Sequence, residues 1–302
     1  MQRAAAIKYC LTLFVCIASY ASVFAQQGVD DDLPFGAPDL LLYSDGQAEL
    51  NEAIDLTSPD GLEAKGIIFD ADLTQFYFGV ANGGREQKFA YSGHGDYVLN
   101  LDMDRLAGRE GLFLQVRAEH RFGQDVNLNT GALMPSSILT SLPVPNKEDL
   151  VLSEYFATQF FSDNVAVFAG KTVRLEGDPL QFAAGRGREQ FSNLAFVANP
   201  LPLLAIPYSS LSAGVFYTAD PQFNQYLRFV IIDPTDTTTT NGFNNLFSEG
   251  VTLVAEGRLH TKLAGKSGHV LMGGVWSSRD FNAIGQDPRI LFPPLNVPIG
   301  EK

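Results

Sequence analysis

Two stretches of alternating residues, joined by a short polar connection, occupy 97–123. In 97–104, apolar residues recur at every second position, and polar residues such as Asn100 and Asp102 stand between them. In 112–121 the alternation continues, and its polar positions are Gln115, Arg117, Glu119 and Arg121. Because successive side chains of a strand point to opposite sides, each stretch predicts a β-strand with one apolar and one charged face. Such strands suit either a soluble sheet or a membrane barrel with lipid on one face and a water-filled interior on the other.

The first 25 residues have the pattern of a secretory signal peptide. Arg3 and Lys8 precede an apolar run over 9–18, and a small-residue cleavage pattern ends at Ala25. The run is shorter than the roughly 20 apolar residues that a membrane-spanning helix needs, which argues against an N-terminal anchor. We therefore expect 1–25 to be removed on export.

Composition and charge exclude several classes of function. The chain carries a formal net charge of −13, and an acidic exported protein lacks the basic surface that nucleic-acid binding requires. Both cysteines, Cys10 and Cys16, fall within the predicted signal peptide, so the exported chain would have no disulfide and no thiol nucleophile. The four histidines lack metal-ligand spacing, and no nucleophile elbow or phosphate-binding loop occurs. The sequence predicts no cofactor, no metal site and no catalytic residues.

The rest of the chain has the composition of strands and loops. Residues 26–65 are acidic and rich in turn formers and are expected to form a flexible lead-in, 81–95 are expected to form a glycine-rich loop, and 279–302 are a proline-rich C-terminal segment. Alternating or continuous apolar runs between these segments predict roughly nine strands. The predicted strands are 66–80, 97–104, 112–123, 150–161, 165–173, 209–218, 225–232, 250–263 and 268–278.

Short and long connections alternate along the predicted strands. The connections at 105–111 and 162–164 are short, whereas those at 127–149 and 174–207 are long. Outer-membrane barrels have this asymmetry, with tight periplasmic turns and long external loops. The fold class predicted is therefore all-β, an antiparallel outer-membrane β-barrel whose wall comprises 66–278.

Two blocks in this region carry motifs of a known family. Residues 95–111 read GDYVLNLDMDRLAGREG, an alternating Leu-Asp strand followed by a short turn with leucine and glycine. Residues 152–171 read LSEYFATQFFSDNVAVFAGK, a hairpin with Gln159, Phe161 and Asp163 at regular spacing. Together, in this order and behind a signal peptide, the blocks resemble the carbohydrate-selective porins of the OprB family, over roughly 66–278.

The resemblance implies a sixteen-stranded channel, trimeric in related porins, through which sugars diffuse across the bacterial outer membrane. It implies sugars as permeating solutes, outer-membrane lipid around the barrel, a homotrimer as the assembly, and no enzymatic activity. It also implies that a long loop folds into the lumen, which here would be 174–207. Because about nine strands are fewer than sixteen, and because the chain ends in Gly300-Glu301-Lys302 without a terminal aromatic residue, we expect a truncated member with a partial barrel.

Candidate sugar contacts follow from the chemistry of hydroxyl groups, which donate to carboxylates and accept from the planar donor fork of arginine. Charged side chains in rings also tune the selectivity of pores. The alternative for the strand residues is a face in contact with bulk water, and for the loop residues it is a charged external loop. The candidates are Gln115, Arg117, Glu119 and Arg121 on one strand; Glu256, Arg258 and Lys262, with His260, on another; and Arg174, Arg186 and Arg188 in a long connection.

A second class of function stays open from the sequence, namely a secreted soluble all-β protein that binds or hydrolyses carbohydrate. In a soluble sandwich the apolar strand faces pack against each other. In a barrel they form a band that faces lipid. What the apolar faces meet therefore distinguishes the two.

Overall fold

The computed structural model of the protein describes residues 14–16, 59–132, 134–143, 150–173, 187–188, 191–198, 202, 205–219, 225–263 and 265–280. Most of the predicted proline-rich C-terminal segment, of the predicted lead-in and of the predicted signal peptide lies outside these ranges. Among the helices within them, none has the length and hydropathy needed to cross a bilayer.

The strands form one antiparallel sheet, in which each strand from β2 to β10 pairs with the next one in sequence. A three-residue strand, β1 (Phe14–Cys16), adds to the other side of β10. The nine strands from β2 onward agree with the predicted number and order. They are β2 (Ile67–Gly79), β3 (Phe89–Asp102), β4 (Leu112–Gly123), β5 (Val151–Ser162), β6 (Val165–Val173), β7 (Ser209–Thr218), β8 (Tyr226–Ile232), β9 (Thr252–Leu263) and β10 (Lys266–Ser277).

The predicted loop at 81–95 was wrong in its second half, because β3 begins at Phe89 and pairs with β2 along its whole length. Gly93 and Gly95, which suggested a loop, lie inside the strand. A Cβ at Gly93 would meet the ring of Phe122, and a Cβ at Gly95 would meet the ring of His120. These glycines therefore make room for aromatic rings of the neighbouring strand β4, a role that glycine has where a side chain crosses the backbone closely.

Short helices lie in the connections. Met103 and Asp104, predicted as the end of a strand, instead begin α2, because the Asp102 side chain accepts a hydrogen bond from the backbone N–H of Asp104 at 3.0 Å and so caps the helix. The helix ends at Gly108, whose φ of 62° is left-handed. The helices are α1 (Pro59–Ala64), α2 (Met103–Ala107), α3 (Asn127–Thr130) and α4 (Leu194–Val197), with 3₁₀ turns η2 (Leu139–Ser141) and η4 (Phe243–Asn245).

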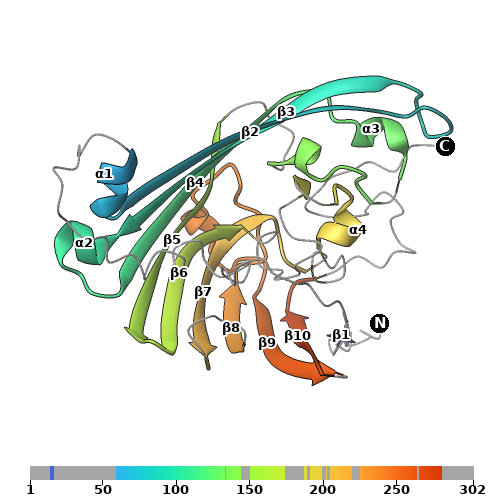
Figure 1. The fold of residues 1–302 in the computed structure, drawn as a ribbon. Helices are drawn as coiled ribbons and strands as arrows, with labels where there is room; N and C mark the ends of the chain where they lie inside the picture. Colours follow the sequence, from blue (N-terminus) through green and yellow to red (C-terminus); the bar gives the residue numbers. More distant parts are fainter. Residues whose placement is uncertain are drawn as a thin grey trace, which may run out of the picture.

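The longest connections gather at one end of the sheet, as predicted, although 80–88 at that end is no longer than 103–111 at the other. At one end lie the connections β3–β4, β5–β6, β7–β8 and β9–β10, and the shortest of them consist of Asp163 and Asn164 or of 264–265. At the other end lie 80–88, 124–150, 174–208 and 233–251. Figure 1 shows the sheet curling around the part of the chain that contains α3 and α4, and both helices belong to connections at the long end.

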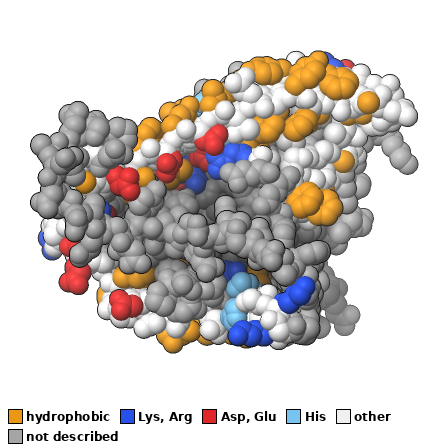
Figure 2. Space-filling view, in the orientation of Figure 1, with side chains coloured by type: hydrophobic (Ala, Val, Ile, Leu, Met, Phe, Trp, Pro, Cys, Tyr) orange, Lys and Arg blue, Asp and Glu red, His pale blue; other side chains and the backbone are white. Residues whose placement is uncertain are grey.

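The two faces of the sheet have opposite environments. The face that carries the predicted charged positions, here called the inner face, is buried: Arg117 is 3% exposed and Glu119 is 0% exposed. The opposite or outer face leaves large apolar side chains exposed, such as Tyr77 at 70% and Phe161 at 69%. In Figure 2 apolar side chains run along β2 and β3. A soluble sandwich would bury its apolar faces, so the polarity of this sheet is inverted relative to that alternative.

Parts of two long connections pack inside the curve of the sheet. Their apolar residues form a buried cluster with Phe76 of β2 and Val173 of β6. Because β2 and β6 are four strands apart in the sheet, the cluster bridges the interior. The expectation that the connection at 174–207 enters the interior is confirmed for its described residues. The cluster's members from the connections are Ile138, Leu139, Leu142, Leu194, Val197 and Tyr208.

A third long connection folds back over the outer face. Lys171 of β6 pairs with Tyr155 of β5, which pairs with Val116 of β4, so the three lie in one row of the outer face. The Lys171 side chain is nevertheless buried, at 1% exposure. Because two of its acceptors belong to the connection β8–β9, that connection covers the outer face at this end of β6. The ammonium donates to the carbonyl oxygens of Leu152 (2.7 Å), Thr240 (3.0 Å) and Thr238 (3.2 Å).

The described sheet has two edges. Within the described residues β2 pairs only with β3, and β1 pairs only with β10. The structure therefore shows a curved, open sheet, which agrees with the predicted partial barrel of about nine strands.

Candidate functional site

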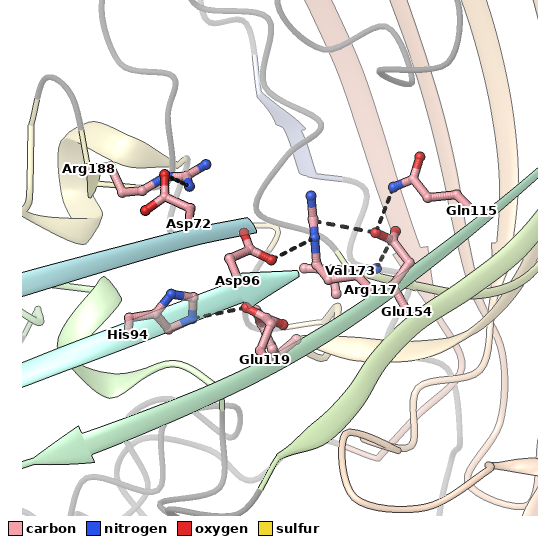
Figure 3. A network of polar contacts seen from close by, with 10 residues as sticks. Asp72, His94, Asp96, Gln115, Arg117, Glu119, Glu154, Val173 and Arg188 are labelled. Carbon is pink, nitrogen blue, oxygen red and sulfur yellow. Dashed lines mark hydrogen bonds and ion pairs between the residues drawn. The ribbon is translucent and has the colours of Figure 1, made fainter. Parts of the chain in front are cut away.

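Arg117 lies at the centre of a buried ionic network on the inner face, shown in Figure 3. Its Nε is 3.2 Å from Oδ1 of Asp96, and its Nη1 is 3.4 Å from Oε2 of Glu154. The three side chains come from β3, β4 and β5. They meet because Arg117 of β4 pairs directly with Glu154 of β5. On the other side, Asp96 lies two positions along β3 from the residue that pairs with Arg117. The exposure of each of the three side chains is 6% or less.

Glu154 connects this network to two further groups. Its Oε2 accepts a hydrogen bond from the side-chain amide of Gln115 at 3.1 Å. Its Oε1 accepts one from the backbone N–H of Val173 at 3.1 Å. The carboxylate therefore receives donors from a guanidinium, an amide and the backbone, which fixes its orientation.

A second carboxylate, Glu119, links the sheet to the connection that precedes β7. The hydroxyl of Tyr208 donates to both carboxylate oxygens, at 2.8 and 2.7 Å. His94 Nε2 lies 3.1 Å from Glu119 Oε1, and the ring donates when that nitrogen carries the proton. Since Tyr208 also belongs to the buried apolar cluster, this contact fixes the end of the connection 174–208 against the inner face.

Arg121 holds the other interior connection. Its Nη1 donates to the carbonyl of Thr140 at 3.0 Å and lies 3.6 Å from Oδ2 of Asp125. Asp125 in turn accepts hydrogen bonds from the hydroxyls of Ser141 at 2.6 Å and Thr140 at 3.1 Å. These contacts fix η2 against the end of β4.

Of the three predicted loop arginines, Arg188 is described and reaches the sheet. Its Nη1 is 2.7 Å from Oδ2 of Asp72 on β2. This contact is partly exposed to solvent, at 25% for the Arg188 side chain, and Figure 3 places it beside the network around Arg117. Arg174 and Arg186 lie outside the described residues.

The predicted residues on β9 differ in how far they are buried. Glu256 lies on the inner face and forms an ion pair with Arg228 of β8 at 2.9 Å. It also accepts a hydrogen bond from the Tyr226 hydroxyl at 2.8 Å. Arg258 is 8% exposed in the same region. Lys262 is exposed, close to the β9–β10 turn, and so is His260. All four residues share one face of β9, as predicted, because they alternate along the strand. Their contact with a solute stays a prediction.

Several residues of the network were missed from the sequence. Asp96 and His94 share the parity of the predicted polar positions, and extending the strand past Gly95 would have found them. Glu154 stands in the second sequence block, but nothing in the sequence indicated that it meets Arg117. The contact between Tyr208 and Glu119 joins residues 89 positions apart, and local alternation carries no information at that range.

The network is chemically a fixed array of donors and acceptors. Burying an ion costs several kcal/mol unless it is paired, and each carboxylate described above has a cation, an imidazole or a hydroxyl within hydrogen-bond or ion-pair distance. A polyhydroxylated solute could exchange hydrogen bonds with this array only where the polar atoms of the array reach the surface, as at the partly exposed pair of Arg188 and Asp72. Among the residues that the structure describes, no group of three His, Cys, Asp or Glu side chains has the geometry of a metal site.

Comparison with known proteins indicates a family of porins. A family model for carbohydrate-selective porins, the OprB family, matches residues 86–300. The high-pH structure of Pseudomonas putida OprB is similar to this chain, with a TM-score of 0.57 and 18% identity over 73% of this chain and 55% of that chain. The low-pH structure of the same protein has a TM-score of 0.44 and 14% identity, over 72% of this chain and 57% of that one. No curated protein sequence matches the chain. The chain thus spans about half the length of the solved relatives, and the likeness to the first is one of fold.

Proposed function

This chain belongs to the carbohydrate-selective porin, OprB family, and from that premise we propose that it forms the wall of a passive channel for sugars in the bacterial outer membrane. The proposal includes export by the signal peptide at 1–25, sugars as solutes, surrounding outer-membrane lipid, and assembly as a homotrimer. It assigns transport and no catalysis to the chain.

The inverted polarity of the sheet carries the proposal. On β4 the charged positions are almost fully buried and the alternating apolar positions lie on the outer face. Water on both sides would favour the reverse arrangement, since exposed apolar surface costs roughly 25 cal/mol per Å². Lipid on the outer side removes this cost, and an interior lined with polar groups suits a path for hydrophilic solutes.

The proposed solute contacts lie at two heights of the inner face. Toward the long connections are Arg117, Glu119 and Arg121, with Arg188 beside them. Gln115 lies between the two heights, where it pairs with Phe156. Toward the short connections are Glu256 and Arg258, with Lys262 at the mouth. Arg174 and Arg186 remain candidates in the connection 174–208. Neutral sugars are favoured by the mixture of paired acids and bases, because each pair presents donors and acceptors without a strong net field.

Cell fractionation and conductance test the proposal. We expect the chain in the outer-membrane fraction, with a different gel mobility before and after heating, and crosslinking should give a trimer. In planar bilayers it should form pores whose ion current falls when D-glucose or maltose is added. A chain found in the soluble fraction without heat-modifiable mobility would contradict the barrel, and a pore that ignores every sugar would contradict the solute assignment.

A further inference from the structure

The inner face changes character between its two ends. Toward the long connections it carries the ionic network described above. Toward the short connections it carries six aromatic rings, which lie on the inner face by strand alternation and by their pairing with inner-face residues such as Gln115 and Ala166. We call these rings the aromatic band. Its members are Phe113, Phe156, Phe160, Phe168, Phe216 and Tyr226.

The band consists of three ring pairs that follow one another around the sheet. Phe113 of β4 and Phe160 of β5 meet edge to face, with centroids 5.8 Å apart. Phe156 of β5 and Phe168 of β6 also meet edge to face, at 6.4 Å. The third pair, Phe216 of β7 and Tyr226 of β8, is stacked at 5.3 Å. Aromatic rings therefore line the inner face from β4 to β8.

Neither lipid contact nor core packing accounts for the band. The outer face of the same strands already presents aromatic side chains, including Phe161, Tyr217 and Phe229, so an inward ring gives up contact with lipid. Of the six rings, Phe168 alone packs against an apolar cluster of the described residues, the one around Ile206. All of the band except Tyr226 is only partly buried, which leaves ring surface toward the interior.

Polar groups stand at the β8 end of the band. Phe216, Arg228 and Glu256 occupy one pairing row across β7, β8 and β9. Arg228 and Glu256 form an ion pair at 2.9 Å with exposures of 26% and 16%, so both remain accessible. A pyranose has an apolar C–H face and an equator of hydroxyls. The first suits an aromatic ring, and the second suits a carboxylate beside a guanidinium.

We propose that the aromatic band is a stacking track for pyranose rings, and that Phe216 with the Arg228–Glu256 pair forms a sugar subsite at its end. The inference rests on the proposed channel function and deepens it, because it assigns ring stacking to one half of the inner face and hydrogen-bond exchange to the other. Acyclic polyols of similar size lack a ring face and should interact with the track only weakly.

Block of the ion current in planar bilayers tests the track, with the full chain purified from outer membranes. The probes are D-glucose and D-mannitol, and the variants are Phe216→Leu and Phe156→Leu, which keep the side chains apolar and of similar volume. We expect the glucose concentration for half block, measured relative to the sugar-free current of the same variant, to rise about three- to tenfold in each variant. The control is Tyr217→Leu, which removes an outward ring next to Phe216 and should leave the block unchanged.

The outcomes separate the track from the channel function. A wild-type pore that glucose blocks, with the same half-block concentration in both inner variants, overturns the track and leaves the channel function standing. Equal losses for glucose and mannitol also overturn it, because they indicate a change of pore shape. A wild-type pore that neither solute affects overturns the channel function, and the track with it. Heat-modifiable mobility of each variant establishes that it has folded, and if one inner variant does not fold the other decides.

Discussion

The buried charge of Arg117 is stabilised by two neighbouring carboxylates. The guanidinium lies between Asp96 and Glu154, and removing one member of a buried ionic group costs far more than removing an exposed ion pair. The same reasoning applies to Lys171 on the outer face, whose three carbonyl acceptors take the place of water. At the scale of single residues, the charges are held in fixed positions by neighbours from other segments.

Replacing Arg117 should destabilise the folded chain strongly. In Arg117→Gln, two buried carboxylates lose the guanidinium between them, and we expect the free energy of unfolding to fall by about 3–5 kcal/mol. Urea unfolding in lipid vesicles measures this change. Arg105→Gln is the control, because Arg105 pairs with Asp102 at 3.3 Å while 35% exposed, and its loss should cost less than about 1 kcal/mol. Equal effects of the two substitutions would contradict the role given to the network.

Replacing Lys171 should free the connection over the outer face. Lys171→Met keeps the length of the side chain but removes all three hydrogen bonds to carbonyls, so we expect faster cleavage by an added protease within 233–251. Mass spectrometry of the fragments from intact cells locates the cut. Lys266→Met, at an exposed position of the β9–β10 hairpin, should leave the cleavage rate unchanged, and an unchanged rate in Lys171→Met would show that other contacts hold the connection.

At the scale of elements, period-two alternation was sufficient to predict the nine strands and the segregation of their connections. It failed at 81–95, where Gly93 and Gly95 looked like loop residues. Glycine is needed at these positions because the rings of Phe122 and His120 on the next strand occupy the space that a Cβ would take. Alternation likewise assigned Arg117 and Glu119 to one face. It could not predict their partners, because pairing register and the path of the long connections decide which side chains meet.

Glycine substitutions test this account of β3. Gly95→Ala places a Cβ against the His120 ring, and such overpacking costs about 1–3 kcal/mol. We expect a lower temperature for loss of the folded band on gels. Gly274→Ala on β10 is the matched control, since a Cβ there meets nothing within 4 Å. A loss of stability as large at Gly274 would attribute the effect to glycine in general and not to the ring.

For the whole molecule, the main property is the division of the sheet into an outer face that suits lipid and an inner face with a charged and an aromatic half. The sequence predicted which residues share a face, but it could not decide what each face meets. Burial distinguishes the two faces, since Glu119 is 0% and Tyr77 is 70% exposed. The aromatic half was not predicted, because the rings come from five strands and no single strand carries more than two of them.

A charge on the outer face tests the division directly. Phe229 is 56% exposed on β8, and Phe229→Arg would place a guanidinium in the lipid at a cost of up to about 2–4 kcal/mol, depending on depth. We expect reduced folding into vesicles, measured as the fraction with heat-modifiable mobility. Phe229→Leu should fold like the wild type. Normal folding of Phe229→Arg would mean that this face does not meet hydrocarbon.

The pairing of every strand from β2 to β10 with its neighbour in sequence has a consequence for how the molecule assembles. A wall of this topology can grow one hairpin at a time, each adding to the edge left by the one before. Contacts across the interior, such as that of Tyr208 with Glu119 over 89 residues, close a much longer stretch of chain and carry a larger entropic cost. The topology thus implies that the sheet forms before the long connections pack inside it. In the proposed channel, a molecule arrested between the two steps would leave a wide opening, and the late contacts would narrow it.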